Sequence, residues 1–170
     1  MQNDERYLRW CLKQNKGIRV DKASENLVKA YLQKSRNASK SMEVNAQAGL
    51  AEWAIAASYY AKYFAVYSLL SKIGVKCEIH DCTITVFEYL FGDSISKETL
   101  KELRDSKENR VEAQFYTQEI NVELGEVIKK TKQFVLEIEK LIDSLNPENI
   151  LRMQNKLKIL VPKRKSFPST

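Results

Sequence analysis

The chain is short of glycine and proline, the residues that turn a polypeptide sharply, with five glycines and three prolines among 170 residues. A β-sandwich or barrel needs turn residues about every 8–12 positions, so this shortage excludes those folds and favours long helices. Long apolar runs are also lacking, since none approaches the ~20 residues that cross a bilayer, and the N-terminus does not look like a signal peptide. We therefore expect a cytoplasmic protein without a membrane segment.

Cysteine and histidine are scarce as well, with three cysteines and one histidine in the chain. An odd cysteine count without a secretory segment predicts reduced thiols. Cys77, His80 and Cys82 lie close in sequence, but a structural zinc site takes four ligands, commonly as two close pairs. The glycines are at least 18 residues apart, which excludes a glycine-rich phosphate loop. We expect no metal and no cofactor.

Positive charge is concentrated at the two ends of the sequence. Residues 1–48 and 147–170 each carry a net charge of +5, whereas residues 49–95 and 96–146 each carry −2. Basic segments can contact the phosphate backbone of a nucleic acid. They can equally form solvated helix faces and a loose tail, so charge alone leaves both interpretations open.

Apolar residues recur at spacings of three and four along most of the chain, which predicts helices. Asp21 and Ser96 are expected to cap two of them. Gly74 suits a left-handed helix end, and Asn146 before Pro147 suits a helix start. The run at residues 83–87 has strand propensity, but it has no partner strand elsewhere, which favours a helix there. The predicted helices cover residues 6–16, 21–45, 50–73, 81–91, 97–115, 120–145 and 147–160.

Two of these helices indicate the centre of the fold. Residues 50–73 are apolar on two sides, as expected of a helix in the middle of a bundle. Residues 120–145 have an almost unbroken apolar stripe that needs a partner surface. We predict an all-α fold, an antiparallel up-and-down bundle of four to five core helices with an extra N-terminal and C-terminal helix. The expected divisions are an N-terminal extension at 1–20, the bundle at 21–146, a C-terminal helix at 147–161 and a basic disordered tail at 162–170.

The segment from Arg104 to Tyr116 is the main candidate for chemistry. Arg104 and Arg110 lie on a predicted helix with few apolar residues. Their guanidinium groups could bind phosphate or could pair with neighbouring acidic residues, and the segment alone does not decide between the two. The acidic residues of this helix alternate with lysines, which is typical of a solvated face rather than of acid–base catalysis. A tyrosine series in the central helix could stack bases, but its spacing is more typical of a core: Tyr59, Tyr60, Tyr63 and Tyr67.

Three segments together resemble the HEPN domain superfamily. The run from Ser58 to Leu70, followed by Gly74 and His80, is similar to the signature in which a glycine and a histidine follow a YYA motif. Residues 110–116, RVEAQFY, resemble the arginine-to-tyrosine signature of the short prokaryotic branch, and residues 134–138 resemble part of the family's final helix. The resemblance covers residues 22–145. It implies a four- or five-helix up-and-down bundle that is often dimeric and is often encoded beside a minimal nucleotidyltransferase, as a toxin–antitoxin module.

The resemblance implies less about activity. Active members of the superfamily are metal-independent ribonucleases in which a histidine follows the arginine after four to six residues. No histidine follows Arg104 or Arg110, and Phe115 and Tyr116 stand at the corresponding positions after Arg110. A tyrosine with its ordinary pKa near 10 is a poor acid–base group at neutral pH. The only histidine, His80, belongs to a different predicted helix, so we expect binding of RNA or nucleotide without cleavage.

The residues leave three functional hypotheses. The first is a non-catalytic HEPN-like component of a toxin–antitoxin-type module that binds a nucleotide, RNA or a nucleotidyltransferase through Arg104, Arg110, Tyr116, Tyr60 and His80. The second is a divergent ribonuclease toxin in which Arg110 holds the scissile phosphate and Tyr116 or His80 assists. The third is a structural homodimer or scaffold without a ligand, in which the apolar stripe at 120–145 docks a second protomer.

Overall fold

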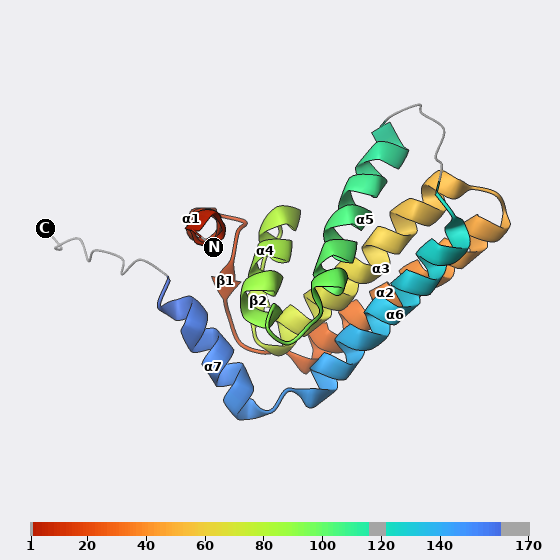
Figure 1. The fold of residues 1–170 in the computed structure, drawn as a ribbon. Helices are drawn as coiled ribbons and strands as arrows, with labels where there is room; N and C mark the ends of the chain where they lie inside the picture. Colours follow the sequence, from red (N-terminus) through yellow and green to blue (C-terminus); the bar gives the residue numbers. More distant parts are fainter. Residues whose placement is uncertain (1, 116–121, 161–170) are drawn as a thin grey trace, which may run out of the picture.

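The computed structural model describes residues 2–115 and 122–160, and it has the predicted all-α architecture (Figure 1). Helices account for nearly all of its regular structure, and the only strands in the described part are two short segments. In chain order the elements are α1 (Gln2–Lys13), β1 (Arg19–Val20), α2 (Glu25–Gln47), α3 (Ala51–Lys72), β2 (Val75–Lys76), α4 (His80–Phe91), α5 (Lys97–Phe115), α6 (Leu124–Ser144) and α7 (Pro147–Lys158).

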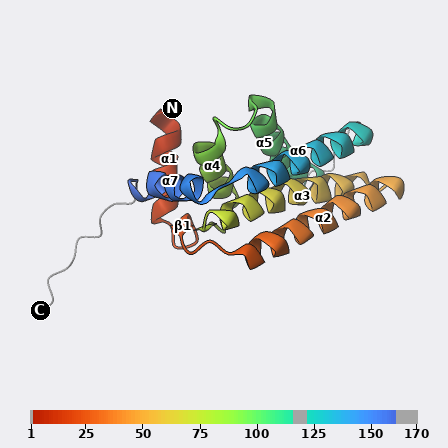
Figure 2. The same ribbon diagram turned by 90° about the horizontal axis from the view of Figure 1, so that it is seen from below.

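The long helices α2, α3, α5 and α6 form an up-and-down bundle with α3 at its centre. α3 contacts α2, α5, α6 and α4, and side chains all around it are buried, as its two apolar stripes predicted. α4 and α1 lie at one end of the bundle, and Figures 1 and 2 together show α1 running across the direction of the long helices. The chain turns between the end of α6 at Ser144 and the start of α7 at Pro147, and α7 packs near β1.

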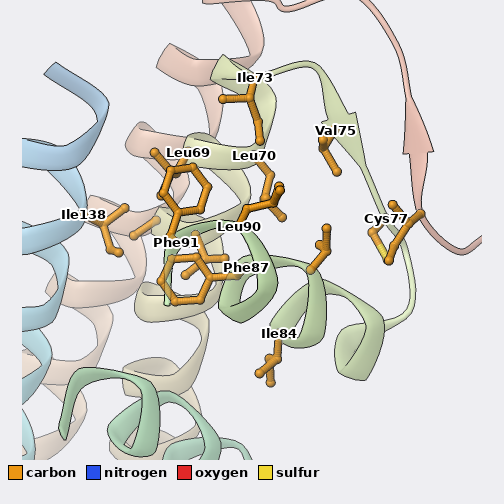
Figure 3. Packing of buried hydrophobic residues seen from close by; sticks show 14 of the residues in the cluster. Leu69, Leu70, Ile73, Val75, Cys77, Ile84, Phe87, Leu90, Phe91 and Ile138 are labelled. Carbon is orange, nitrogen blue, oxygen red and sulfur yellow. The ribbon is translucent and has the colours of Figure 1, made fainter. Parts of the chain in front are cut away.

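The main hydrophobic core lies where α3, α4 and α6 meet. Phe87 and Phe91 of α4 are fully buried beside Leu69 of α3 and Ile138 of α6 (Figure 3). Completely burying side chains of this size contributes on the order of 1.5–3 kcal/mol each before conformational entropy is counted. This core therefore fixes the position of α4, and with it the position of His80 at the start of α4.

Local signals set most of the helix ends. Ser96 accepts a hydrogen bond from the Thr99 amide at 3.0 Å, and Asn146 accepts one from the Asn149 amide at 2.8 Å, so both predicted caps are confirmed. The predicted cap at Asp21 is wrong: α2 begins four residues later, and the side chain of Ser24 caps it. The Asp21 carboxylate instead pairs with Lys76 at 2.6 Å.

The short sheet joins two segments that lie between predicted helices. Arg19 pairs with Lys76 and Val20 with Val75 in an antiparallel register. Gly74 precedes this pairing with a φ of +71°, the predicted left-handed conformation, and a Cβ there would lie 2.3 Å from the Asp21 carbonyl oxygen. The pairing gives hydrogen-bond partners to backbone groups of these two segments, which no helix satisfies.

Two of the three cysteines form a disulfide, so the prediction of reduced thiols is wrong for Cys11 and Cys82. α1 packs against α4 and brings the two Cα atoms to 5.6 Å, although the residues are 71 positions apart in sequence. Leu8 and Cys11 form the buried side of α1. Cys77 keeps a free, buried thiol. Because Cys82 is bonded to Cys11, it is not available as the metal ligand considered above.

Some of the residues named from the sequence cannot be placed. Tyr116 and the tail at 162–170 lie outside the described residues. Within residues 2–115 and 122–160, no helix is both long enough and apolar enough to cross a bilayer.

Candidate functional site

One face of α5 carries a stripe of three cations that runs along α4. Arg104, Lys107 and Arg110 follow one another at intervals of three residues and therefore share one side of the helix. α4 supplies an acidic partner to the first two, since Glu88 pairs with Arg104 and Asp81 pairs with Lys107. Within the described part of the chain, Arg110 has no carboxylate partner.

Arg110 is held instead by aromatic rings of α3. Its guanidinium carbon lies 5.3 Å from the ring centroid of Tyr59 and 5.8 Å from that of Tyr60. Nη1 donates weak hydrogen bonds to the Tyr60 hydroxyl at 3.4 Å and to the Gln114 side-chain oxygen at 3.3 Å. Nε is buried without a hydrogen-bond partner, the one such side-chain atom among the described residues. The site therefore contains a half-buried cation with unused hydrogen-bonding capacity.

His80 lies on the same tyrosine cluster. Its ring stacks on Tyr63 with centroids 4.3 Å apart, and its Nδ1 shares a 2.6 Å hydrogen bond with the Tyr59 hydroxyl. Burial lowers the pKa of His80, and the positive charges of Arg110 and Lys107 lower that pKa further. The imidazole is therefore neutral at about pH 7. Nε2 has no hydrogen-bond partner among the described residues.

The tyrosines of α3 belong to the hydrophobic core and also form part of the candidate site. Tyr59, Tyr63 and Tyr67 follow one another at intervals of four and are buried, which confirms the prediction that this series belongs to the core. Burial raises the pKa of Tyr63 to about 12 and raises the pKa of Tyr59 further, so both phenols stay protonated near neutral pH. Tyr60 is half-buried beside Arg110. The cluster thus offers hydroxyl groups and ring faces, but no negative charge.

The structure places the residues selected from the sequence in two separate groups. Arg110, Tyr60 and His80 come together around Tyr59, although they belong to three different helices. Arg104 lies two turns before Arg110 on α5 and is bound to Glu88. Tyr59 was not predicted to be a site residue, because its place in a core-like series gives no sign that it also contacts His80 and Arg110.

The cluster is suited to binding an anion rather than a metal ion. No group of three or more possible metal ligands occurs in the part of the chain that the structure describes. Arg110 supplies a fixed positive charge, and His80 and Tyr60 supply neutral polar groups beside it. A guanidinium with free N–H groups is the side chain best matched to the oxygens of a phosphate.

The fold and this cluster define a helical-bundle domain with a candidate anion site where α4 and α5 pack on the central helix α3. The HEPN domain family model matches residues 28–142, which is more than half of the chain. The chain therefore belongs to the HEPN family, and the resemblance found in the sequence is confirmed at this level. Comparison with curated proteins gives no match.

Proposed function

We propose that this HEPN protein binds the phosphate of RNA or of a nucleotide at Arg110, without cleaving it. The observation that carries the proposal is that Arg110, alone of the three cations along α4, has no acidic partner among the described residues and keeps a buried Nε without a hydrogen bond. Leaving such a group unsatisfied costs free energy in the unliganded protein. A phosphate oxygen that reaches this Nε through a small movement of the side chain would remove this cost, and the two weak bonds of Nη1 leave the guanidinium further donors for the same anion.

His80 would be the second contact to the phosphate. When the Tyr59 hydroxyl donates to Nδ1, the proton of the neutral ring resides on Nε2, which can then donate to a phosphate oxygen. Cleavage by attack of a 2′-hydroxyl needs both a proton acceptor and a proton donor. The guanidinium of Arg110 serves as neither because it stays protonated. One imidazole in the donor tautomer therefore supports binding better than it supports catalysis.

A divergent metal-independent ribonuclease is the second candidate, favoured by the position of His80. The sequence assigned His80 and Arg110 to different helices, but both lie on the Tyr59 ring cluster. In the opposite tautomer Nδ1 donates to the Tyr59 oxygen, and Nε2 becomes free to accept a proton from a 2′-hydroxyl. Arg110 would then stabilise the charge that develops on the phosphate.

The biological context that we propose is that of the short prokaryotic branch of the family, which residues 110–116 resemble. There the protein would act as one component of a toxin–antitoxin-type module, with a minimal nucleotidyltransferase as a protein partner and a homodimer as its assembly state. A cytoplasmic location is part of the proposal. The Cys11–Cys82 disulfide is compatible with it because both side chains are fully buried, which restricts attack by cellular thiols.

Arg110→Ala tests the proposal, with Arg36→Ala as the matched control. Arg36 is an exposed arginine of α2 that already pairs with Glu139 at 2.9 Å. Fluorescence polarisation with a labelled single-stranded RNA at about 50 mM salt is expected to show a 10- to 100-fold loss of affinity for Arg110→Ala, since hydrogen bonds to charged groups contribute about 1.5–3 kcal/mol. Arg36→Ala is expected to change the affinity less than about threefold.

Incubation of the same RNA with the unmodified protein separates the three hypotheses. RNA that stays intact while bound supports the proposal. Cleavage that is abolished by both Arg110→Ala and His80→Ala would establish the ribonuclease instead. No binding of RNA or mononucleotide at low salt would overturn both and leave the scaffold hypothesis.

A further inference from the structure

A groove outside the Arg110 cluster lies between α1, α4 and α5. It has a volume of about 710 Å³, within the range of about 300–1,000 Å³ that is usual for small-molecule sites. α1 forms one wall, and this helix precedes the region that matches the HEPN family. One wall of the groove is therefore built from residues outside the part of the chain that matches the family model.

The α1 wall presents an exposed aromatic surface. Tyr7 and Trp10 stack on each other with ring centroids 5.3 Å apart and an angle of 17° between their planes. Both line the groove, and their exposed fractions are 38% and 45%. The anchoring of α1 does not depend on them, because Leu8 and Cys11 supply its buried side and the disulfide to Cys82 ties it to α4. Two large rings are thus left facing solvent on a fixed helix.

The opposite wall is polar, and the groove as a whole is balanced in charge. Its lining holds three cations, one of them Arg6 of α1, and three carboxylates from α4 and α5. Two ion pairs, Arg104 with Glu88 and Lys107 with Asp81, cross from α5 to α4. A surface with this balance has little attraction for a phosphate. It does present hydrogen-bond donors and acceptors opposite the aromatic wall. A flat, uncharged ligand with donors and acceptors along its edges matches both walls, and a nucleobase has these properties.

The groove also leads toward the Arg110 cluster. Asp81 directly follows His80 on α4, and Lys107 lies one turn before Arg110 on α5. The charges of Lys107 and Asp81 act on the His80 ring, so the end of the groove and the cluster are electrostatic neighbours. A ligand with a base in the groove can therefore direct a linked phosphate toward Arg110.

We propose that the groove binds a nucleobase of the RNA, stacked on Tyr7 and Trp10. The proposal rests on RNA being the ligand of the Arg110 site. It adds a second contact beside that site, in which the aromatic rings of α1 bind a base. Stacking of a base on an aromatic side chain accepts every base, so the expected ligand is single-stranded RNA with little sequence preference.

Trp10 itself can report on the binding. The chain has two tryptophans, and Trp53 does not line the groove, so Trp53→Phe leaves Trp10 as the only tryptophan, which can be excited selectively over the tyrosines. In this background adenosine is expected to quench the Trp10 emission in a saturable manner, whereas ribose 5-phosphate is not. Adding Tyr7→Ala is expected to weaken adenosine binding several-fold, and adding Arg110→Ala is expected to leave it within about twofold.

RNA affinity distinguishes failure of this inference from failure of the proposed function. In the otherwise unmodified chain, Trp10→Ala is expected to weaken binding of single-stranded RNA by about fivefold to a hundredfold, the effect expected for loss of one stacked base. Trp53→Ala is the control and is expected to change it less than about twofold. If Trp10→Ala has no effect while Arg110→Ala still weakens binding 10- to 100-fold, the groove is not a base site although the phosphate site stands. If neither variant affects RNA binding, both proposals fail. Absence of quenching by adenosine at millimolar concentration would also overturn the groove proposal.

Discussion

Two cations at the α3–α5 interface differ in how their charge is balanced. Lys62 of α3 is 1% exposed, and its Nζ pairs with a Glu102 oxygen of α5 at 2.7 Å. Arg110 lies two turns further along α5 and rests on the rings of Tyr59 and Tyr60, without a carboxylate partner among the described residues. The same pair of helices thus neutralises one positive charge and leaves the other open.

The difference separates a structural charge from a binding charge. Burying an ammonium group costs several kcal/mol unless a counterion accompanies it, so Lys62 is tolerated because Glu102 reaches it. Burial still lowers the pKa of Lys62, against the opposing effect of Glu102. A guanidinium is hydrated more weakly and packs well on aromatic faces, so Arg110 can be half-buried without a counterion. Removing partners should therefore affect stability at Lys62 and ligand affinity at Arg110.

The largest expected effect is on stability. Glu102→Gln leaves Lys62 buried without its counterion and is expected to lower the free energy of unfolding by about 3 kcal/mol, measured by urea denaturation. Glu5→Gln is the matched control: Glu5 pairs with Arg9 at 2.6 Å on the exposed surface of α1, far from Lys62 in the sequence, and its loss is expected to cost less than about 0.5 kcal/mol. Equal, small losses for both variants would show that Lys62 is not dependent on Glu102.

A double variant sharpens this test. Lys62→Met together with Glu102→Gln removes both members of the pair and is expected to restore most of the lost stability, because an apolar side chain of similar length needs no counterion. RNA affinity of the double variant is expected to stay within about twofold of the unmodified protein, since neither residue belongs to the Arg110 cluster.

The next effect concerns pH and has opposite signs for binding and stability. The pKa of His80 is lowered in the folded protein, so the unfolded chain takes up a proton first as the pH falls below about 6.5. Unfolding therefore becomes easier on acidification through this group. A bound phosphate favours the protonated ring, so RNA affinity is expected to rise several-fold between about pH 7.5 and pH 5.5. In His80→Gln, the pH dependence of both the free energy of unfolding and the RNA affinity is expected to be smaller. An unchanged pH dependence of RNA affinity in this variant would show that His80 does not contact the phosphate.

Most of the fold could be predicted because its signals are local. Ser96, Asn146 and Gly74 set helix ends through residues within a few positions, and the apolar stripe of α3 indicated its central place without reference to other helices. The cap of α2 was misassigned because Asp21 has the right side chain, but its carboxylate pairs with Lys76, 55 residues away. The strand pair and the Cys11–Cys82 bond likewise depend on contacts between distant segments, and no local pattern reveals them.

The sequence indicated which residues belong to the site, but not which residues they contact. Arg110, Tyr60 and His80 were selected from motifs, but their meeting depends on how α4 and α5 pack on α3. The sequence offered Arg104 the acidic residues of its own helix, whereas its partner is Glu88 of α4. Tyr59 was classified as core, which is correct, and the same burial is what brings its hydroxyl to His80. Composition and spacing cannot reveal a side chain that has two roles.

The smallest expected effect separates the ring of Tyr60 from its hydroxyl group. The Arg110 Nη1 and the Tyr60 hydroxyl are 3.4 Å apart, a long hydrogen bond that contributes little, while the guanidinium carbon lies 5.8 Å from the ring centroid. Cation–π contacts of this kind contribute about 0.5–1 kcal/mol, which corresponds to two- to fivefold in affinity when the cation is the binding group. Tyr60→Phe keeps the ring and is expected to bind RNA within about twofold of the unmodified protein, whereas Tyr60→Leu is expected to lose two- to fivefold. If Tyr60→Phe loses as much as Tyr60→Leu in the same polarisation assay, the hydroxyl group contacts the ligand directly, and Arg110 is positioned by Tyr59 alone.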